Sequence, residues 1–278
     1  MPGSFSRSLD LLSETWRVLA KDRELLLFPV MSGAVTLIII LSFLLPVIFF
    51  GLTNQIGRIH PIFIFAAIYL FYYISYAVVI FFNTGLVTCA AIRLSGGDPT
   101  IRDGLSNAFR HLGSILAWAA VAATVGLILG TISQRSGLLG RILIAIIGFV
   151  WSLATFLVIP VMIFEDRGVI ESIHESFSLL KRTWGENIIA NFTLGILYIP
   201  AILMMIFCAI TPLFGNIWVI FASISITILL IAVAGIFHST LQGIFITALY
   251  YYAKTGEMPR YIRGDMIRNA FAKKPPVL

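Results

Sequence analysis

The sequence predicts an all-α polytopic membrane protein, in which six transmembrane helices form three parallel pseudo-repeats with cytoplasmic amphipathic helices. Composition is the first reason: 59% of the 278 residues are hydrophobic and 12% are charged. A soluble domain carries about 25% charged residues. The chain therefore cannot cover a water-facing surface with charge, which excludes a soluble domain, a disordered chain and a nucleic-acid-binding domain. The other two reasons are the apolar stretches and the sorting of the charges.

Six apolar stretches are long enough to cross a bilayer, which takes about 20 residues of helix. They are Leu25–Leu52, Pro61–Ile92, Leu112–Ile132, Leu138–Phe164, Ile188–Ile210 and Phe214–Tyr252. The last could instead form two short spans with a break near residues 238–243. That would place the basic C-terminal tail on the outside, so we expect one long helix that projects past the membrane. The second span is also long, and its polar break is Asn83-Thr84-Gly85.

The basic residues are sorted between the two sides of these spans. Of the 19 lysines and arginines, all but Arg58, Arg135 and Arg141 fall on one side. By the positive-inside rule, that side is cytoplasmic. We therefore expect a multi-pass protein of the cytoplasmic membrane with both termini in the cytoplasm.

The segments between the spans repeat an apolar spacing of three and four residues, which predicts amphipathic helices. We call these segments the collar; their apolar residues are Phe5, Leu9, Leu12, Trp16 and Leu19; Ile101, Leu105, Phe109 and Leu112; and Ile170, Ile173, Phe177, Leu180 and Trp184. Residues 8–16 and 176–184 are similar in sequence. Residues 1–278 are thus predicted to form a single membrane domain of three units, near 5–97, 98–167 and 168–258. A basic tail, 259–278, follows.

Residues capable of chemistry are few. The motifs of metalloproteases, serine hydrolases and nucleotide-binding loops do not occur. Cys89 and Cys208 lie singly in apolar runs, which indicates neither a disulfide framework nor a metal site. We expect no enzyme activity and no cofactor.

Polar residues near membrane depth are the candidate ligand sites, because such residues are costly and can mark function. Asn83, His238 and Gln242 form one candidate polar band, although interhelical hydrogen bonding is the simpler role. Glu165 and Asp166 follow the fourth span. They could bind a cation, and the simpler expectation is that they stabilise the positive N-terminus of the next helix.

The stretch from Val158 to Glu186 resembles a family of prokaryotic six-span proteins of unknown function. It contains Val158-Ile159-Pro160-Val161-Met162, Glu165-Asp166 and Ser176-Phe177-Ser178-Leu179-Leu180-Lys181-Arg182-Thr183-Trp184, and Phe28-Pro29 fits the family's opening. The sequence is also loosely similar to YciC-type proteins and to the membrane domain of some glycerophosphodiester phosphodiesterases. The resemblance implies an all-helical cytoplasmic-membrane protein without an assigned activity.

Two functions follow as expectations. The first is a non-enzymatic membrane protein that organises lipid or partner proteins at the cytoplasmic face through the collar. Its partners would be membrane lipids, including anionic lipid at the C-terminal tail, with no nucleic acid. The alternative is a transporter or channel for a lipid or small hydrophobic molecule. The polar band is the observation that suggests this alternative.

Overall fold

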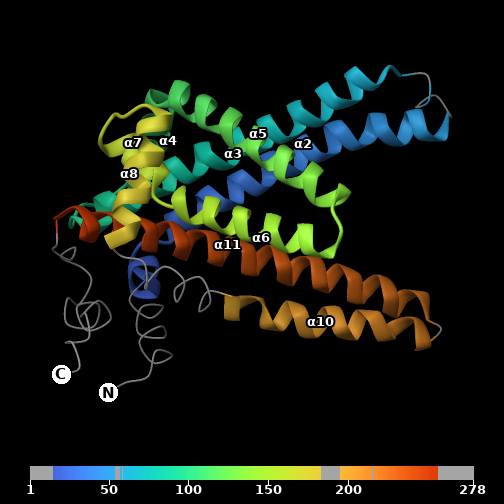
Figure 1. Cartoon of the computed structure of the whole chain (residues 1–278). Helices are drawn as coiled ribbons and strands as arrows, with labels where there is room; N and C mark the ends of the chain where they lie inside the picture. Colours follow the sequence, from blue (N-terminus) through green and yellow to red (C-terminus); the bar gives the residue numbers. More distant parts are fainter. Residues whose placement is uncertain (1–14, 54–56, 58, 183–194, 215, 256–278) are drawn as a thin grey trace, which may run out of the picture. The chain divides into compact units, whose positions relative to one another are not determined.

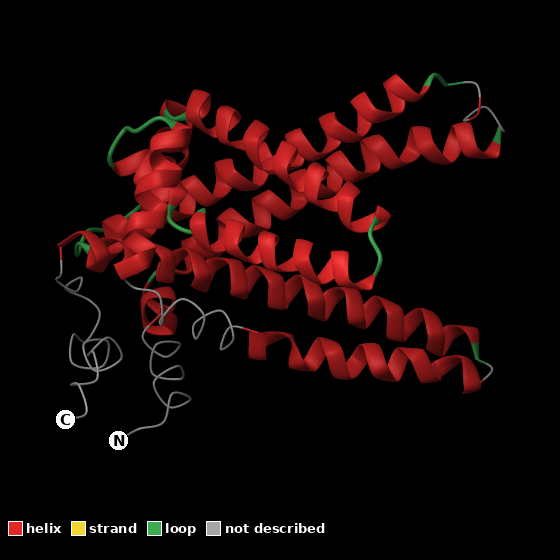
Figure 2. Ribbon diagram, in the orientation of Figure 1, coloured by secondary structure: helices red, strands yellow, loops and turns green. Residues whose placement is uncertain are grey.

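The computed structural model describes residues 15–53, 57, 59–182, 195–214 and 216–255. Every regular element among these residues is a helix, as Figure 2 shows. The chain divides into two compact units, each described by itself. Unit 1 comprises Met1–Leu26, Ala90–Asp98 and Thr183–Leu278, and unit 2 comprises Leu27–Cys89 and Pro99–Arg182. The predicted all-α fold class is confirmed.

Unit 2 holds most of the long apolar helices (Figure 1). They are α2 (Leu27–Leu52), α3 (Pro61–Leu94, which continues into unit 1), α5 (Leu112–Arg135) and α6 (Leu138–Ala154). The shorter helices α4 (Ile101–Arg110), α7 (Val158–Phe164) and α8 (Val169–Arg182) join them. The predicted second span is a helix without a break at Asn83.

Unit 1 contains the C-terminal helices. The short helices η3 (Gly195–Tyr198) and α10 (Ile199–Ile210) lead through η4 (Thr211–Phe214) into α11 (Ile217–Thr255), and α10 packs along α11 (Figure 1). An N-terminal helical stretch, residues 15–21, is followed by η1 (Arg23–Leu26). The 39 residues of α11 form one uninterrupted helix, so the expected single long helix is confirmed in preference to two short ones.

Five segments among the described residues are long and apolar enough to cross a membrane: Arg23–Leu52, Pro61–Leu94, Leu112–Arg135, Leu138–Phe164 and Ile217–Thr255. Their agreement with five of the six expected stretches supports a membrane protein. The remaining stretch, Ile188–Ile210, begins outside the described residues, and its described part is the 12-residue α10. The sixth span and the three-unit repeat stay predictions.

A proline explains the break in the fourth span. Pro160 lies in α7, and its ring would collide with the carbonyl of residue 156 if α6 continued through this point. The helix is interrupted at residues 155–157, and the backbone N–H of Leu157 donates to the buried Ser176 Oγ of α8, at 3.0 Å. A hydroxyl from a neighbouring helix thus satisfies an amide that the break exposes.

The packing of α2, α3 and α4 depends on a residue cluster that we call the Phe28 junction: Phe28, Gly85, Cys89 and Gly104. The Phe28 side chain is 1% exposed. A Cβ atom at Gly85 would lie 2.5 Å from Phe28 Cε1, and one at Gly104 would lie 2.5 Å from Phe28 Cζ and 2.7 Å from the Gly85 carbonyl oxygen. Two glycines therefore provide the space for the ring and let α4 approach the backbone of α3.

The buried core of unit 2 continues from this junction. It joins the second half of α3, the helix α4, the first half of α5 and the helix α7; its residues are Ile80, Val87, Ala108, Ile115, Trp118, Ala119, Val158, Met162 and Ile163. Neither α2 nor the first half of α3 contributes a fully buried side chain to this core. Protein-to-protein packing in unit 2 is thus concentrated where the short helices meet the long ones.

We predict that Gly104→Ala destabilises the protein, because the new Cβ overlaps both Phe28 and the Gly85 carbonyl. Overpacking of this kind costs about 1–3 kcal/mol, against about 1 kcal/mol gained from alanine's helix propensity. The measurement is thermal unfolding in detergent. Gly130→Ala on α5 is the control, because a Cβ there meets nothing within 4 Å. Equal midpoints for the two variants would contradict the junction.

Candidate functional site

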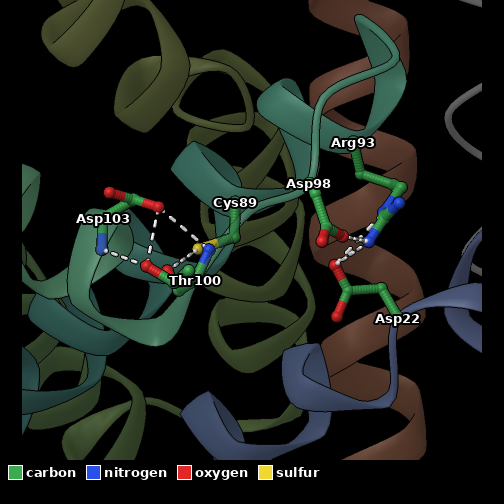
Figure 3. A network of polar contacts seen from close by, with 6 residues as sticks. All are labelled: Asp22, Cys89, Arg93, Asp98, Thr100 and Asp103. Carbon is green, nitrogen blue, oxygen red and sulfur yellow. Dashed lines mark hydrogen bonds and ion pairs between the residues drawn. The ribbon is translucent and has the colours of Figure 1, made fainter.

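A capping box starts α4 (Figure 3). The backbone N–H and the hydroxyl of Thr100 donate to Asp103 Oδ2, at 2.9 and 2.7 Å, and the Asp103 N–H donates to Thr100 Oγ1 at 3.3 Å. Reciprocal bonds of this kind satisfy amides that have no partner within a helix. The hydrogen bonds from the Thr100 side chain and backbone lower the pKa of the Asp103 carboxyl below its ordinary value.

Polar contacts fix α4 against α3. The Cys89 thiol of α3 donates to the Thr100 carbonyl, at 3.3 Å, and is buried. One to two turns further, Asn107 Nδ2 donates to Thr88 Oγ1 at 2.8 Å, and that hydroxyl donates to the Thr84 carbonyl. Cys89 and Asn107 therefore hold the register that brings Gly104 onto Gly85, and Cys89 has a packing role here.

Unit 1 contains an arginine between two carboxylates, which Figure 3 shows from close by. Arg93 Nε and Nη2 donate to Asp22 Oδ2 at 3.2 and 3.1 Å, and Nη2 also donates to Asp98 Oδ1. The Asp22 side chain is 4% exposed, whereas that of Asp98 is 92% exposed. A buried carboxylate requires such a partner, because desolvating an unpaired charge is costly. The network joins the start of η1 to the end of α3.

The end of α3 fixes the position of Arg93. Gly96 has a φ of 95°, its N–H donates to the Arg93 carbonyl, and the Gly97 N–H donates to the Ile92 carbonyl. This is the Schellman pattern of a helix C-terminus, which favours glycine in the left-handed region. Arg93 therefore lies in the last turn of a helix with a defined end.

The acidic residues predicted after the fourth span have basic partners. Asp166 Oδ1 lies 2.9 Å from His111 Nε2, and Glu165 Oε2 lies 2.9 Å from Arg167 Nε. His111 Nδ1 lies 2.9 Å from the Asn107 carbonyl. Each ring nitrogen of His111 therefore lies beside an oxygen atom that can accept a hydrogen bond. Binding of a cation by Glu165 and Asp166, or stabilisation of the next helix by them, stays a prediction.

Asp166 also turns the chain between α7 and α8. Its φ is 48°, the left-handed region that most residues avoid and that aspartate tolerates comparatively well. Because α7 ends at Phe164, Asp166 directly follows the C-cap. Sequence reasoning missed this conformational role, since no glycine marks the turn.

The residues of the predicted polar band fall in different units. Asn83 is half-buried on α3 in unit 2, whereas His238 and Gln242 are half-buried on α11 in unit 1. The His238 ring packs on Tyr198 of η3, with 5.5 Å between ring centroids. A shared ligand-binding band stays a prediction.

A comparison with protein families identifies the family of this chain. A family model of unknown function, DUF6159, matches residues 62–259. The chain belongs to the DUF6159 family. No curated protein matches it, so the looser likeness to YciC-type proteins and to the phosphodiesterase membrane domain has no support.

In this DUF6159 member, α4 and α8 each expose part of the apolar stripe predicted for them. Phe109 of α4 is 63% exposed, and Ile170 and Phe177 of α8 are 72% and 51% exposed, whereas Leu180 of the same stripe is fully buried. The other residues that these two helices bury are Gly104, Ala108, Ser172, Ser176 and Leu179. The predicted stripes therefore overlap the buried faces only in part, because small and polar residues were not counted as buried.

The first collar segment, residues 5–19, and the end of the third are described only in part. Trp16 stacks on Phe237 of α11 with ring centroids 5.6 Å apart, and Leu19 is buried. Phe5, Leu9, Leu12, Trp184 and the basic tail 259–278 lie outside the described residues. No group of three or more metal-ligating side chains occurs in the part of the chain that the structure describes.

We predict that Thr100→Ala lowers stability at neutral pH by about 1 kcal/mol, the typical effect of losing an N-cap hydroxyl. The carboxyl of Asp103 has a lowered pKa in the fold, so its stabilising effect is present above the unfolded-state pKa. The effect is lost as the pH falls through the folded-state pKa. The difference between Thr100→Ala and wild type in denaturant unfolding should therefore shrink in acid, whereas Ser106→Ala should show no difference at either pH.

Proposed function

We propose that this DUF6159 member is a non-enzymatic, multi-pass protein of the cytoplasmic membrane that organises lipid or partner proteins through α4 and α8. The observation that supports this proposal is the exposure of Phe109, Ile170 and Phe177 on two short helices that adjoin helices long and apolar enough to cross a membrane. Amphipathic helices beside a span lie in the interface, with apolar residues in the headgroup region and cations toward phosphate.

The surroundings of Phe109 support an interfacial position for α4. Phe109 meets Phe81 of α3, with ring centroids 4.9 Å apart, and α3 is one of the candidate spans. Leu112 and Leu116, three and seven residues after Phe109, are 38% and 37% exposed on α5, another candidate span. The exposed apolar surface is thus continuous from α4 onto helices that suit hydrocarbon.

Charge near these side chains fits the same role. Arg102 and Arg110 are exposed on α4, and Lys181 is exposed on α8. One cation close to an anionic membrane surface contributes about 1 kcal/mol to binding. Under the positive-inside rule both helices lie on the cytoplasmic side, where anionic lipid is presented.

The proposal predicts that three substitutions in one chain, Phe109→Ser, Ile170→Ser and Phe177→Ser, reduce the amount of lipid and partner protein that stays bound to α4 and α8. Mass spectrometry of lipids and proteins kept after gentle extraction should show at least a several-fold loss relative to wild type. A double variant, Ser106→Ala with Ser178→Ala, changes exposed polar positions on the same two helices and should behave as wild type.

Thermal unfolding of both variants shows whether they are folded. Because the substituted side chains are more than half exposed, we expect unchanged midpoints. A folded triple-serine variant that retains the same lipids and proteins as wild type would disprove the proposed function.

A carrier or channel for a lipid or small hydrophobic molecule is the second candidate. An apolar cavity between α2 and α3 favours it. Transbilayer movement of a fluorescent phospholipid in proteoliposomes distinguishes the two functions. The organising function predicts the rate of protein-free vesicles, whereas a rate that rises with the amount of protein would favour the carrier.

A further inference from the structure

The cavity between α2 and α3 lies wholly within unit 2. It has a volume of about 790 Å³, within the range of about 300–1,000 Å³ that ligand pockets occupy. α2 lines it from Ile40 to Phe50, and α3 lines it from Phe63 to Tyr72. The rings of Phe43 and Phe71 meet at 5.4 Å between the two helices. In Figure 1 these parts of α2 and α3 lead to the connection between the two helices.

The lining offers almost nothing to a polar ligand. Ser42 Oγ donates to the Ile38 carbonyl at 2.8 Å, so this hydroxyl already has an acceptor. The other polar side chain of the lining belongs to Tyr72, which is 40% exposed. A half-open apolar site of this kind suits hydrocarbon, because it offers water few of the polar partners that water needs.

Pro46 contributes to the shape of the cavity. It lines the cavity and has no amide hydrogen, so the Ser42 carbonyl lacks its usual donor one turn away. A proline in a spanning helix weakens the helical hydrogen bonding on that side. The surface of α2 that lines the cavity is therefore irregular near Pro46, so α3 does not pack closely against it there.

The lining favours alkyl chains. Only Ser42 and Tyr72 among its side chains carry a polar group, and both helices are long and apolar enough to lie in hydrocarbon. The ten steps from Ile40 to Phe50 cover about 15 Å of helix, so an extended hydrocarbon chain can lie along the site. Packing of a second copy of the chain is the other outcome that the experiment distinguishes.

We propose that the α2–α3 cavity is a binding site for an acyl chain of a membrane lipid. The chain enters from the leaflet on the side of the α2–α3 connection, because the lining residues occupy the halves of both helices next to it. Val47 and Phe63 of the lining are 59% and 67% exposed, so the cavity opens onto surfaces that suit hydrocarbon. This site is separate from α4 and α8 and does not require the function proposed for them.

Adjacent alanines on α3 provide a matched test. Ala67 lines the cavity, whereas Ala66 is exposed and does not line it. The full chain is reconstituted in phosphatidylcholine vesicles that contain a phosphatidylcholine with a diazirine at mid-chain. After irradiation and digestion, mass spectrometry should locate adducts at the lining residues of α2 and α3, at a higher yield than at Ala66.

Ala67→Trp fills the cavity and should reduce these adducts at least fivefold, while Ala66→Trp should leave them unchanged. If Ala67→Trp fails to fold, competition by an excess of unlabelled fatty acid in the wild-type chain provides the same test, with at least a fivefold reduction expected. Adducts at the lining residues no more abundant than at Ala66 would indicate bulk lipid only and overturn the site, as would equal losses in both variants. A disulfide-linked dimer through Ala67→Cys, with no adducts at these residues, would assign the cavity to a second copy and overturn it too.

Discussion

The constraint on which the rest of the structure depends is that large apolar side chains cover the outside of the long helices. Phe28 is the buried residue of the 26-residue α2, and α2 exposes leucine, isoleucine and phenylalanine along most of its length. In water each square ångström of such surface costs about 25 cal/mol. In hydrocarbon the cost vanishes, and the backbone must instead satisfy its own hydrogen bonds, which helices do. Both the uninterrupted α11 and the repair of the α6–α7 break by Ser176 follow from this requirement.

With lipid as solvent, helix association depends on close packing and local hydrogen bonding. The Phe28 junction supplies the packing, since Gly85 and Gly104 make room for one ring and for the close approach of two backbones. Thr88, Thr227 and Thr247 place their hydroxyls on carbonyls one turn earlier in their own helices, so these three buried hydroxyls are satisfied locally. Cross-helix polar contacts, such as that of Asn107 with Thr88, are then free to set register.

Much of the fold could be predicted from the sequence, because a helix that crosses a bilayer must be apolar over about 20 residues, and such runs can be recognised directly. Five of the six stretches and the single long C-terminal helix follow from runs of apolar residues. The burial of Ser172 and Ser176 on α8 could not be predicted, because these polar residues become buried only when other helices pack against α8. The contact of Asp166 with His111 spans 55 residues and depends on a left-handed turn that no glycine announces. The candidates Asn83 and His238 were chosen by residue type and depth, and neither property determines which side chains meet.

The central claim is that the apolar surfaces of α2, α3, α5, α6 and α11 lie in the hydrocarbon of a bilayer. Extraction of isolated membranes with alkaline carbonate tests it most directly, since this treatment strips peripheral proteins and leaves spanning ones. The account predicts that the full chain stays in the membrane pellet and is released only by detergent. Release of the chain into the carbonate supernatant would contradict it.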